Sequence, residues 1–247
     1  MKTRASTLLK QETARISPYF KKEPVKTIKQ EIKIQDIPAQ GVPDNVDVDL
    51  KVLFVGINPG LTSAAKGHHY AGPTNHFWPC LSESGLVDRK VTFTDDVALP
   101  ALYRLGFTNL TARASRRQTD LSLAEQREGI PMLNHKFETL RPRVACFVGK
   151  GIYEIYSGKK CNTMGLQPEE HNIKWLSADG EKGETVMFVM PSTSGIVTAY
   201  QKPDKIKFFQ ELCTVAQQQD KMYPPPMRTV KLEDQQVASD DHSSDNP

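Results

Sequence analysis

Three short apolar runs, each ending at a glycine or a proline, constrain the fold of this chain more than any other feature. The runs and the residues that end them are 51–55 with Gly56, 143–148 with Gly149, and 185–190 with Pro191. Continuous apolar strands of this length are typical of a sheet that is buried on both faces. Because helical patterns lie between the runs, we expect a three-layer α/β/α domain with a central, mostly parallel sheet.

Two longer segments have a helical pattern. Residues 122–140 begin with Ser122 and Glu125 at the spacing of a capping box, and Pro131 predicts a kink within them. Residues 204–217 place apolar side chains on one stripe, which is typical of an amphipathic helix. Ligands of such domains bind beyond the carboxyl ends of the strands, so we expect the loops after the three runs to form the functional site.

The two ends of the chain lack sustained apolar periodicity. We expect a disordered basic tail over residues 1–47, a folded domain over 48–223 and a disordered acidic tail over 224–247. The net charge of +3 permits a polyanionic partner without requiring one. No signal peptide or membrane-spanning run is visible, and four irregularly spaced cysteines suggest buried thiols rather than a metal site.

The first run leads into the loop Gly56-Ile57-Asn58-Pro59-Gly60. Its glycines allow the backbone to approach a ligand closely, and the Asn58 amide can both donate and accept hydrogen bonds. Glycine, asparagine and proline also mark ordinary turns, so spacing alone leaves a plain strand-to-helix turn as an equal alternative. The loop lacks the Gly-Lys-Ser/Thr sequence of a nucleotide-binding Walker loop.

Residues 66–78 gather histidine, tyrosine, asparagine and tryptophan between glycines. Three histidines raise the possibility of zinc, but His68 and His69 are adjacent, and His76 lies beyond a Gly-Pro break. No acidic residue or cysteine stands among them, so we expect no metal. The composition suits a pocket for a planar ligand better.

The third loop covers residues 190–198 and follows the last apolar run. Ser192, Thr193 and Ser194 offer hydroxyls that suit phosphate contacts, and residues 195–197 could form an apolar wedge that enters stacked bases. A plain turn with an apolar anchor is an equal alternative when the loop is considered alone.

Four blocks together resemble the thymine-DNA glycosylase / mismatch-specific uracil-DNA glycosylase family. They are residues 53–61, 66–78, 106–110 and 149–154, and the resemblance extends from about residue 50 to about residue 215. It implies a uracil-DNA glycosylase-like fold and a monomeric hydrolase of base excision repair that acts in the nucleus without a cofactor. The implied substrate is double-stranded DNA with a G·U or G·T mismatch, from which the mispaired base is flipped out before its N-glycosidic bond is hydrolysed.

The resemblance also implies roles for single residues. Asn58 matches the catalytic residue that positions the attacking water, and a neutral amide is a weak base, so we expect slow catalysis. The base-pocket positions are Gly56, Ile57, Ser63, His69, Tyr70, Asn75, Asn109 and Ser115. The DNA-binding positions are Lys150, Ser192, Ser194, Gly195, Ile196 and Val197.

This chain departs from the family pattern at two places. Vertebrate-type members carry Ala-Arg-Cys at the wedge, where this chain has Gly195-Ile196-Val197, and Ser115 replaces a common threonine. The preference among uracil, thymine and modified cytosines therefore stays open. In the tails, Lys231 and Lys29 fit the pattern for SUMO conjugation, and Lys231 is the stronger candidate.

Two other functions remain possible on the sequence. A mismatch-binding protein without catalysis would keep the same motifs. A nucleotide-binding enzyme of the doubly wound class is disfavoured, because no phosphate-binding fingerprint or ribose-binding acidic residue is apparent.

Overall fold

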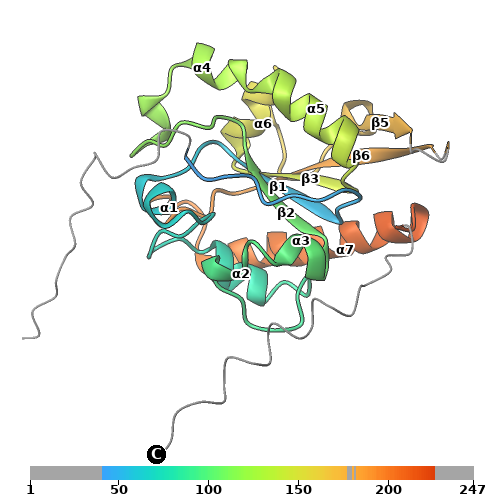
Figure 1. Ribbon diagram of the computed structural model, residues 1–247, viewed down its shortest axis with the longest axis horizontal. Helices are drawn as coiled ribbons and strands as arrows, with labels where there is room; N and C mark the ends of the chain where they lie inside the picture. The colour runs from blue at the N-terminus through green and yellow to red at the C-terminus, as the bar shows by residue number, and fades with distance from the viewer. Residues whose placement is uncertain (1–40, 177–179, 181, 226–247) are drawn as a thin grey trace, which may run out of the picture. The chain divides into compact units, whose positions relative to one another are not determined.

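The computed structural model describes residues 41–176, 180 and 182–225, and its centre is a mostly parallel sheet with helices on both faces (Figure 1). The strands are β1 (Val52–Gly56), β2 (Leu105–Asn109), β3 (Val144–Val148), β4 (Gly165–Leu166), β5 (Ile173–Leu176) and β6 (Lys182–Met190). The parallel strands run in the order β2-β1-β3-β6, and β4 and β5 pair with β6 in antiparallel fashion. The expected α/β fold is thus confirmed.

Alternation along the central strand explains its continuous apolar run. Val52 and Phe54 of β1 belong to one apolar cluster, whereas Leu53 and Val55 belong to a second cluster on the opposite face. All five residues of β1 are buried, because helices cover both faces of the sheet.

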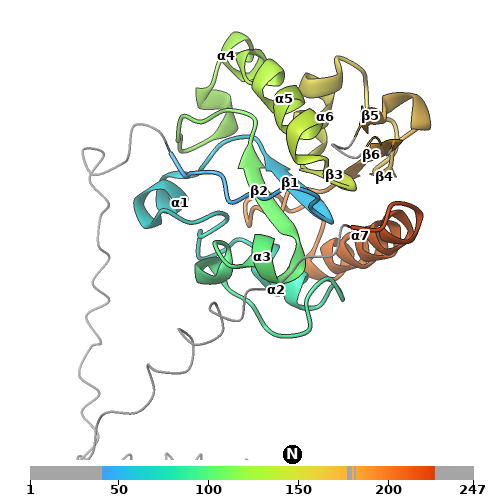
Figure 2. The same cartoon turned by 45° about the vertical axis from the view of Figure 1, so that its right-hand side comes forward.

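Helices and short 3-10 turns connect the strands. They are α1 (Leu61–Lys66), α2 (Phe77–Ser82), η2 (Phe93–Asp95), α3 (Leu99–Tyr103), η3 (Gln118–Asp120), α4 (Leu123–Glu128), α5 (Ile130–Leu140), α6 (Lys150–Ser157), η4 (Glu169–His171) and α7 (Lys202–Met222). Figures 1 and 2 show α4, α5 and α6 over one face and α2, α3 and α7 over the other. None of these helices is both long and apolar enough to cross a membrane.

The helical segment predicted over residues 122–140 is two helices, not one kinked helix. The Ser122 hydroxyl accepts the Glu125 N–H at 3.1 Å, which confirms the predicted cap. The break falls at Gly129, where a Cβ atom would lie 1.7 Å from the Leu110 carbonyl oxygen, and Pro131 lies in the first turn of α5. Pro131 has no N–H to continue the hydrogen bonds of α4, so the predicted kink is a full break between two helices, placed at Gly129 where the chain packs closely on Leu110.

Residues 41–47, which the sequence assigned to the N-terminal tail, pack against the sheet. Asn45 forms an antiparallel bridge with Phe107 through N–H···O contacts of 3.0 and 2.7 Å, and Val42 is buried. The folded part therefore begins before residue 48. Lys29, Lys231 and most of both predicted tails lie outside the described residues.

The four cysteines, Cys80, Cys146, Cys161 and Cys213, are unpaired and buried, as expected. Burial raises the pKa of the Cys80 thiol to about 11 and also raises the pKa of Cys146. The thiols are therefore protonated near neutral pH and poorly nucleophilic.

Candidate active site

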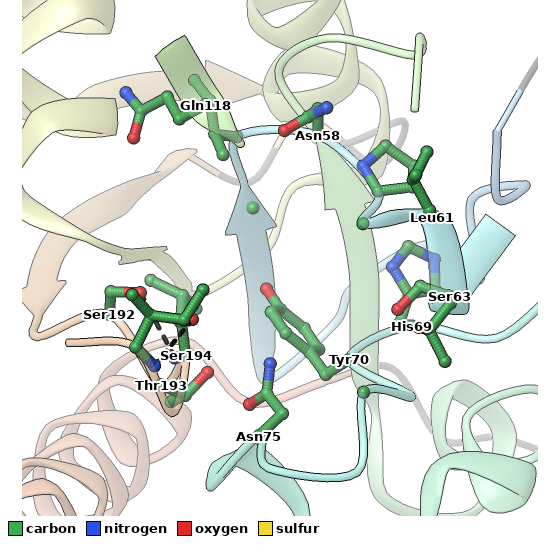
Figure 3. Close-up of a pocket in the computed structure, with 18 of the residues that line it drawn as sticks. Asn58, Leu61, Ser63, His69, Tyr70, Asn75, Gln118, Ser192, Thr193 and Ser194 are labelled. Carbon is green, nitrogen blue, oxygen red and sulfur yellow. Dashed lines mark hydrogen bonds between the residues drawn. The ribbon is translucent and has the colours of Figure 1, made fainter. Parts of the chain in front are cut away.

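The loops after the parallel strands enclose a pocket of about 610 Å³ (Figure 3). Asn58, all the predicted base-pocket residues, and Ser192 with residues 194–197 line it. The structure therefore brings together three segments that are far apart in the sequence. Lys150 is the exception, because it lines a smaller neighbouring pocket of about 240 Å³. The two pockets share the lining residues Ile57, Gln118, Val148, Ser192 and Val197.

The Asn58 side chain is held through its nitrogen. Nδ2 donates to the Arg113 carbonyl oxygen at 2.9 Å and to the Ser115 hydroxyl at 2.8 Å. Oδ1 has no hydrogen-bond partner among the described residues and faces the side of the pocket where Gln118 lies (Figure 3). The fixed amide therefore presents an acceptor to the pocket, which is the orientation needed to hold a water molecule.

The backbone of the Asn58 loop (residues 56–60) is fixed by the segment after β2. The Gly56, Ile57 and Pro59 carbonyl oxygens accept N–H groups of Leu110, Thr111 and Ser115 at 2.8, 2.8 and 3.1 Å. This loop is therefore more than an ordinary turn, because a second loop sets its conformation.

Gly56 lies close to two polar side chains of the pocket. A Cβ atom there would lie 2.5 Å from Asn109 Oδ1 and 3.3 Å from the Tyr70 hydroxyl. Only glycine lets these two polar side chains reach the same part of the pocket.

Tyr70 places a buried hydroxyl at the pocket, and this hydroxyl has no hydrogen-bond partner among the described residues. Its ring stacks on Phe77 with centroids 4.0 Å apart, and its φ of +53° lies in the left-handed region. Burial raises the pKa of Tyr70 above its usual value, so the hydroxyl keeps its proton as a donor. An unsatisfied buried hydroxyl costs about 1–3 kcal/mol. A ligand atom that accepts from it would offset that cost.

The Ser63 and Asn75 side chains each have one fixed partner. The Ser63 hydroxyl accepts the Ala71 N–H at 3.0 Å, and Asn75 Oδ1 accepts the Phe77 N–H at 3.0 Å. The Asn75 amide nitrogen, which Figure 3 shows on the Tyr70 side, remains available as a donor.

His69 is held as a neutral wall residue. The ring Nε2 lies 2.9 Å from the Pro43 carbonyl oxygen, and the His69 backbone N–H donates to the Asp96 carboxylate. Burial lowers the pKa of the His69 ring. With Nε2 donating to that carbonyl, the ring is the neutral Nε2–H tautomer. His68 contacts the same Asp96 carboxylate, whereas His76 lies next to Lys205. In the part of the chain that the structure describes, no group of three or more His, Cys, Asp or Glu residues could hold a metal ion.

The serine loop (residues 192–197) presents an exposed apolar tip on a fixed base. The Ile196 side chain is 81% exposed, and the Ser194 hydroxyl accepts the Ile196 N–H at 3.4 Å. Below the tip, a Cβ atom on Gly195 would lie 2.4 Å from the Thr74 carbonyl oxygen, so the loop packs closely on the residues before α2.

A buried lysine supports the serine loop from below. Lys205 on α7 is 1% exposed, and its Nζ donates to the Ser194 carbonyl oxygen at 3.3 Å and approaches His76 Nδ1 at 3.4 Å. Sequence reasoning missed it, because the predicted apolar stripe of this helix gave no sign of a buried cation.

Sequence reasoning also missed Arg116, Arg117 and Gln118, which line the pocket mouth. Among the described residues that line the pocket, the two arginines are the only ones with a fixed charge, and none carries a carboxylate. No motif marked these positions, because they lie between the recognised blocks 106–110 and 149–154. The site as a whole offers an oriented amide, neutral donors and a positive rim, which suits a polar planar group attached to an anion.

Comparisons with known proteins identify relatives of the chain. A family model described as the uracil DNA glycosylase superfamily matches residues 43–215. A G/U mismatch-specific uracil DNA glycosylase of Schizosaccharomyces pombe is 36% identical over 189 residues, which cover 72% of this chain and 54% of that protein. The chain thus spans about half the length of this relative. A solution NMR structure from Methanosarcina acetivorans, described as a putative uracil DNA glycosylase, has a TM-score of 0.44 and 16% identity, and the match covers 70% of this chain and 98% of that chain.

Proposed function

The chain belongs to the uracil DNA glycosylase superfamily, and we propose that it hydrolyses the N-glycosidic bond of uracil or thymine mispaired with guanine in double-stranded DNA. The observation that carries this proposal is the Asn58 amide, whose nitrogen is held by two hydrogen bonds while its oxygen faces a pocket without carboxylates. The name of the 36% identical relative supports the choice of substrate.

The target nucleotide must leave the duplex to reach this pocket. Flipping costs a few kcal/mol and is cheapest for a mispaired base. In the proposed complex, Ile196 enters the stack where the base has left, and the hydroxyls of the serine loop contact the phosphates. The flipped base lies between Asn75, Asn109 and the unpaired Tyr70 hydroxyl, which can pair with its polar edges.

The reaction replaces the bond from the sugar C1′ to the base nitrogen with a bond from C1′ to a water oxygen. The breaking bond leaves its electron pair on the base, which departs as an anion, and backbone N–H groups around Ile57 stabilise that charge. Asn58 Oδ1 holds the water against the oxocarbenium-like sugar, and the proton that the water loses passes through solvent to the departing base. A neutral amide is too weak a base to take a proton from the water, so the role of Asn58 is to orient the water.

The test is single-turnover base release from a G·U duplex in EDTA, followed by alkali cleavage of the abasic strand. We expect the wild type to cut the uracil strand and Asn58→Ala to lose at least about 100-fold in rate while it still binds the duplex. Full activity of Asn58→Ala would show that Asn58 does not position the water. Intact strands after incubation with excess wild-type protein would instead favour a mismatch-binding protein without catalysis.

We also propose a nuclear location, a monomeric state and SUMO conjugation at Lys231, all from the sequence. Lys231 lies outside the described residues. Conjugation assays with Lys231→Arg beside Lys29→Arg would identify the modified lysine.

A further inference from the structure

Three arginines follow one another closely in the loop between β2 and α4, and they differ in their partners. Arg113 forms a two-pronged ion pair with Glu125, with N···O distances of 2.6 and 2.9 Å. Arg116 and Arg117, called here the arginine rim, are exposed and line the pocket mouth. Neither guanidinium group has an ion-pair or hydrogen-bond partner among the described residues.

Two positively charged side chains that line the same pocket mouth favour an anionic ligand there. No carboxylate is among the described residues that line the pocket, and the Asp120 carboxylate beside the arginine rim binds the Arg117 backbone N–H, not a guanidinium group. Guanidinium groups bind phosphate through paired N–H donors, which makes a phosphodiester a well-matched ligand.

The backbone beneath the arginine rim is fixed although its side chains are free. The Ser115 hydroxyl donates to the Arg117 carbonyl oxygen at 2.7 Å, and the Arg117 N–H donates to the Asp120 carboxylate at 2.9 Å. Arg113 adds a bond of 3.0 Å to the Asp120 carbonyl oxygen. A ligand that binds the arginine rim would therefore order only the side chains, which keeps the entropic cost of binding small.

One hydroxyl joins the arginine rim to the water-positioning residue. Ser115 accepts from Asn58 Nδ2 and donates to the Arg117 carbonyl oxygen. The Ser115 side chain therefore fixes the position of the Arg117 backbone relative to the Asn58 amide. A phosphate bound at the arginine rim would be held at a defined position relative to that amide.

The other candidate contacts cannot supply this charge. The serine loop offers neutral hydroxyls, and its tip, Ile196, is apolar. Lys150 lies 3.9 Å from the Glu154 carboxylate and lines the neighbouring pocket. The positive charge at the mouth of the pocket therefore comes from the arginine rim.

We propose that Arg116 and Arg117 form a phosphate-binding site for the backbone of the DNA strand that carries the flipped nucleotide. The site lies on the Asn58 side of the pocket and acts together with the serine loop. This inference rests on the proposed function for the identity of the anion, but the binding measurement below tests it separately from catalysis.

The experiment measures binding of the full chain to a fluorescein-labelled G·U duplex at several salt concentrations, in an Asn58→Ala background that slows turnover. We expect Arg116→Gln/Arg117→Gln to lower the magnitude of the slope of log affinity against log salt by about 1.8, since each phosphate contact contributes about 0.9. The matched control is Lys207→Gln/Lys221→Gln, which removes two exposed charges on α7 that line no described pocket. It should leave the slope within about 0.4 of the parent value.

An unchanged slope in the arginine double variant, or an equal fall in the lysine control, would overturn the proposed phosphate site. Arg116→Lys/Arg117→Lys should restore the slope, because both charges return. Base release by the wild type is measured in parallel. If the wild type releases no base and the slope still falls only in the arginine variant, the glycosylase function fails and the phosphate site stands. Melting temperatures confirm that the variants fold.

Discussion

Ser115→Ala is the most informative single change near the reacting atoms, because the Ser115 hydroxyl reaches Asn58 without itself holding the water. The change removes the bond from Asn58 Nδ2 at 2.8 Å and the bond to the Arg117 carbonyl oxygen at 2.7 Å. Asn58 then keeps only its bond to the Arg113 carbonyl oxygen, and its amide can rotate away from the attack geometry.

The size of the effect follows from the bonds lost. Each hydrogen bond contributes about 1 kcal/mol net, and each 1.4 kcal/mol is about tenfold in rate. Loss of the Asn58 bond alone predicts a fall of about fivefold in the single-turnover rate, and loss of both predicts about 30-fold. Ser115→Thr keeps the hydroxyl, so we expect its rate to stay within about threefold of the wild type.

The assay is base release from a G·U duplex at saturating enzyme, in a double-mutant cycle with Asn58→Ala. If Ser115 acts through Asn58, Ser115→Ala should change the rate less than about twofold once Asn58 is alanine. An equal fall in both backgrounds would show that Ser115 acts by another route. A wild-type rate in Ser115→Ala would show that the Arg113 carbonyl oxygen alone holds the amide.

Three further predictions concern the pocket wall and its tip. Tyr70→Phe removes a buried hydroxyl that has no partner among the described residues, so thermal unfolding should show a stability that is unchanged or raised by about 1 kcal/mol. Base release by the same variant should slow, because a hydrogen-bond donor to the base is lost. Ile196→Ala should leave the melting temperature unchanged, because the side chain is 81% exposed, and weaken binding to a G·U duplex by about tenfold in titrations. Burial lowers the pKa of His69 below its usual value of 6.5, so the unfolded chain binds more protons than the folded chain as the pH drops below 6.5. The urea concentration at the unfolding midpoint should therefore fall with pH in the wild type, and it should fall less in His69→Gln.

Each of these predictions has an outcome that would contradict it. A less stable Tyr70→Phe variant would mean that the hydroxyl has a partner in the folded protein. Unaltered duplex binding by Ile196→Ala would remove the wedge role. The same pH dependence in wild type and His69→Gln would assign the acid sensitivity to other groups.

Hydrophobic pattern was enough to predict the centre of the fold. The runs that became β1, β3 and most of β6 are continuous because both faces of the sheet are covered. Strand β2 shows only a weak pattern, since Gly106 and Thr108 interrupt it, and it was recognised as a family block instead of a strand. A Cβ atom at Gly106 would lie 2.5 Å from the buried Leu50 side chain, a close approach that arises only in the folded chain.

The pocket was predicted well where motifs existed and poorly where they did not. Most predicted site residues line one cavity, although their roles in catalysis and DNA binding stay predictions. Ser115 was assigned to the base pocket, yet its hydroxyl bonds to Asn58 and Arg117, which no local pattern could have indicated. The burial of Lys205 depends on contacts with loops more than ten residues away in sequence. The apolar pattern of one helix cannot reveal such contacts.

The burial of all four cysteines makes this chain a convenient host for site-directed spectroscopy. A single cysteine introduced at position 196 would be the one readily labelled thiol, because the native thiols are shielded and their pKa values are raised. A fluorophore or spin label attached there would report insertion of the loop tip into a duplex in real time. Its kinetics could then be compared with base release to learn which step limits the rate.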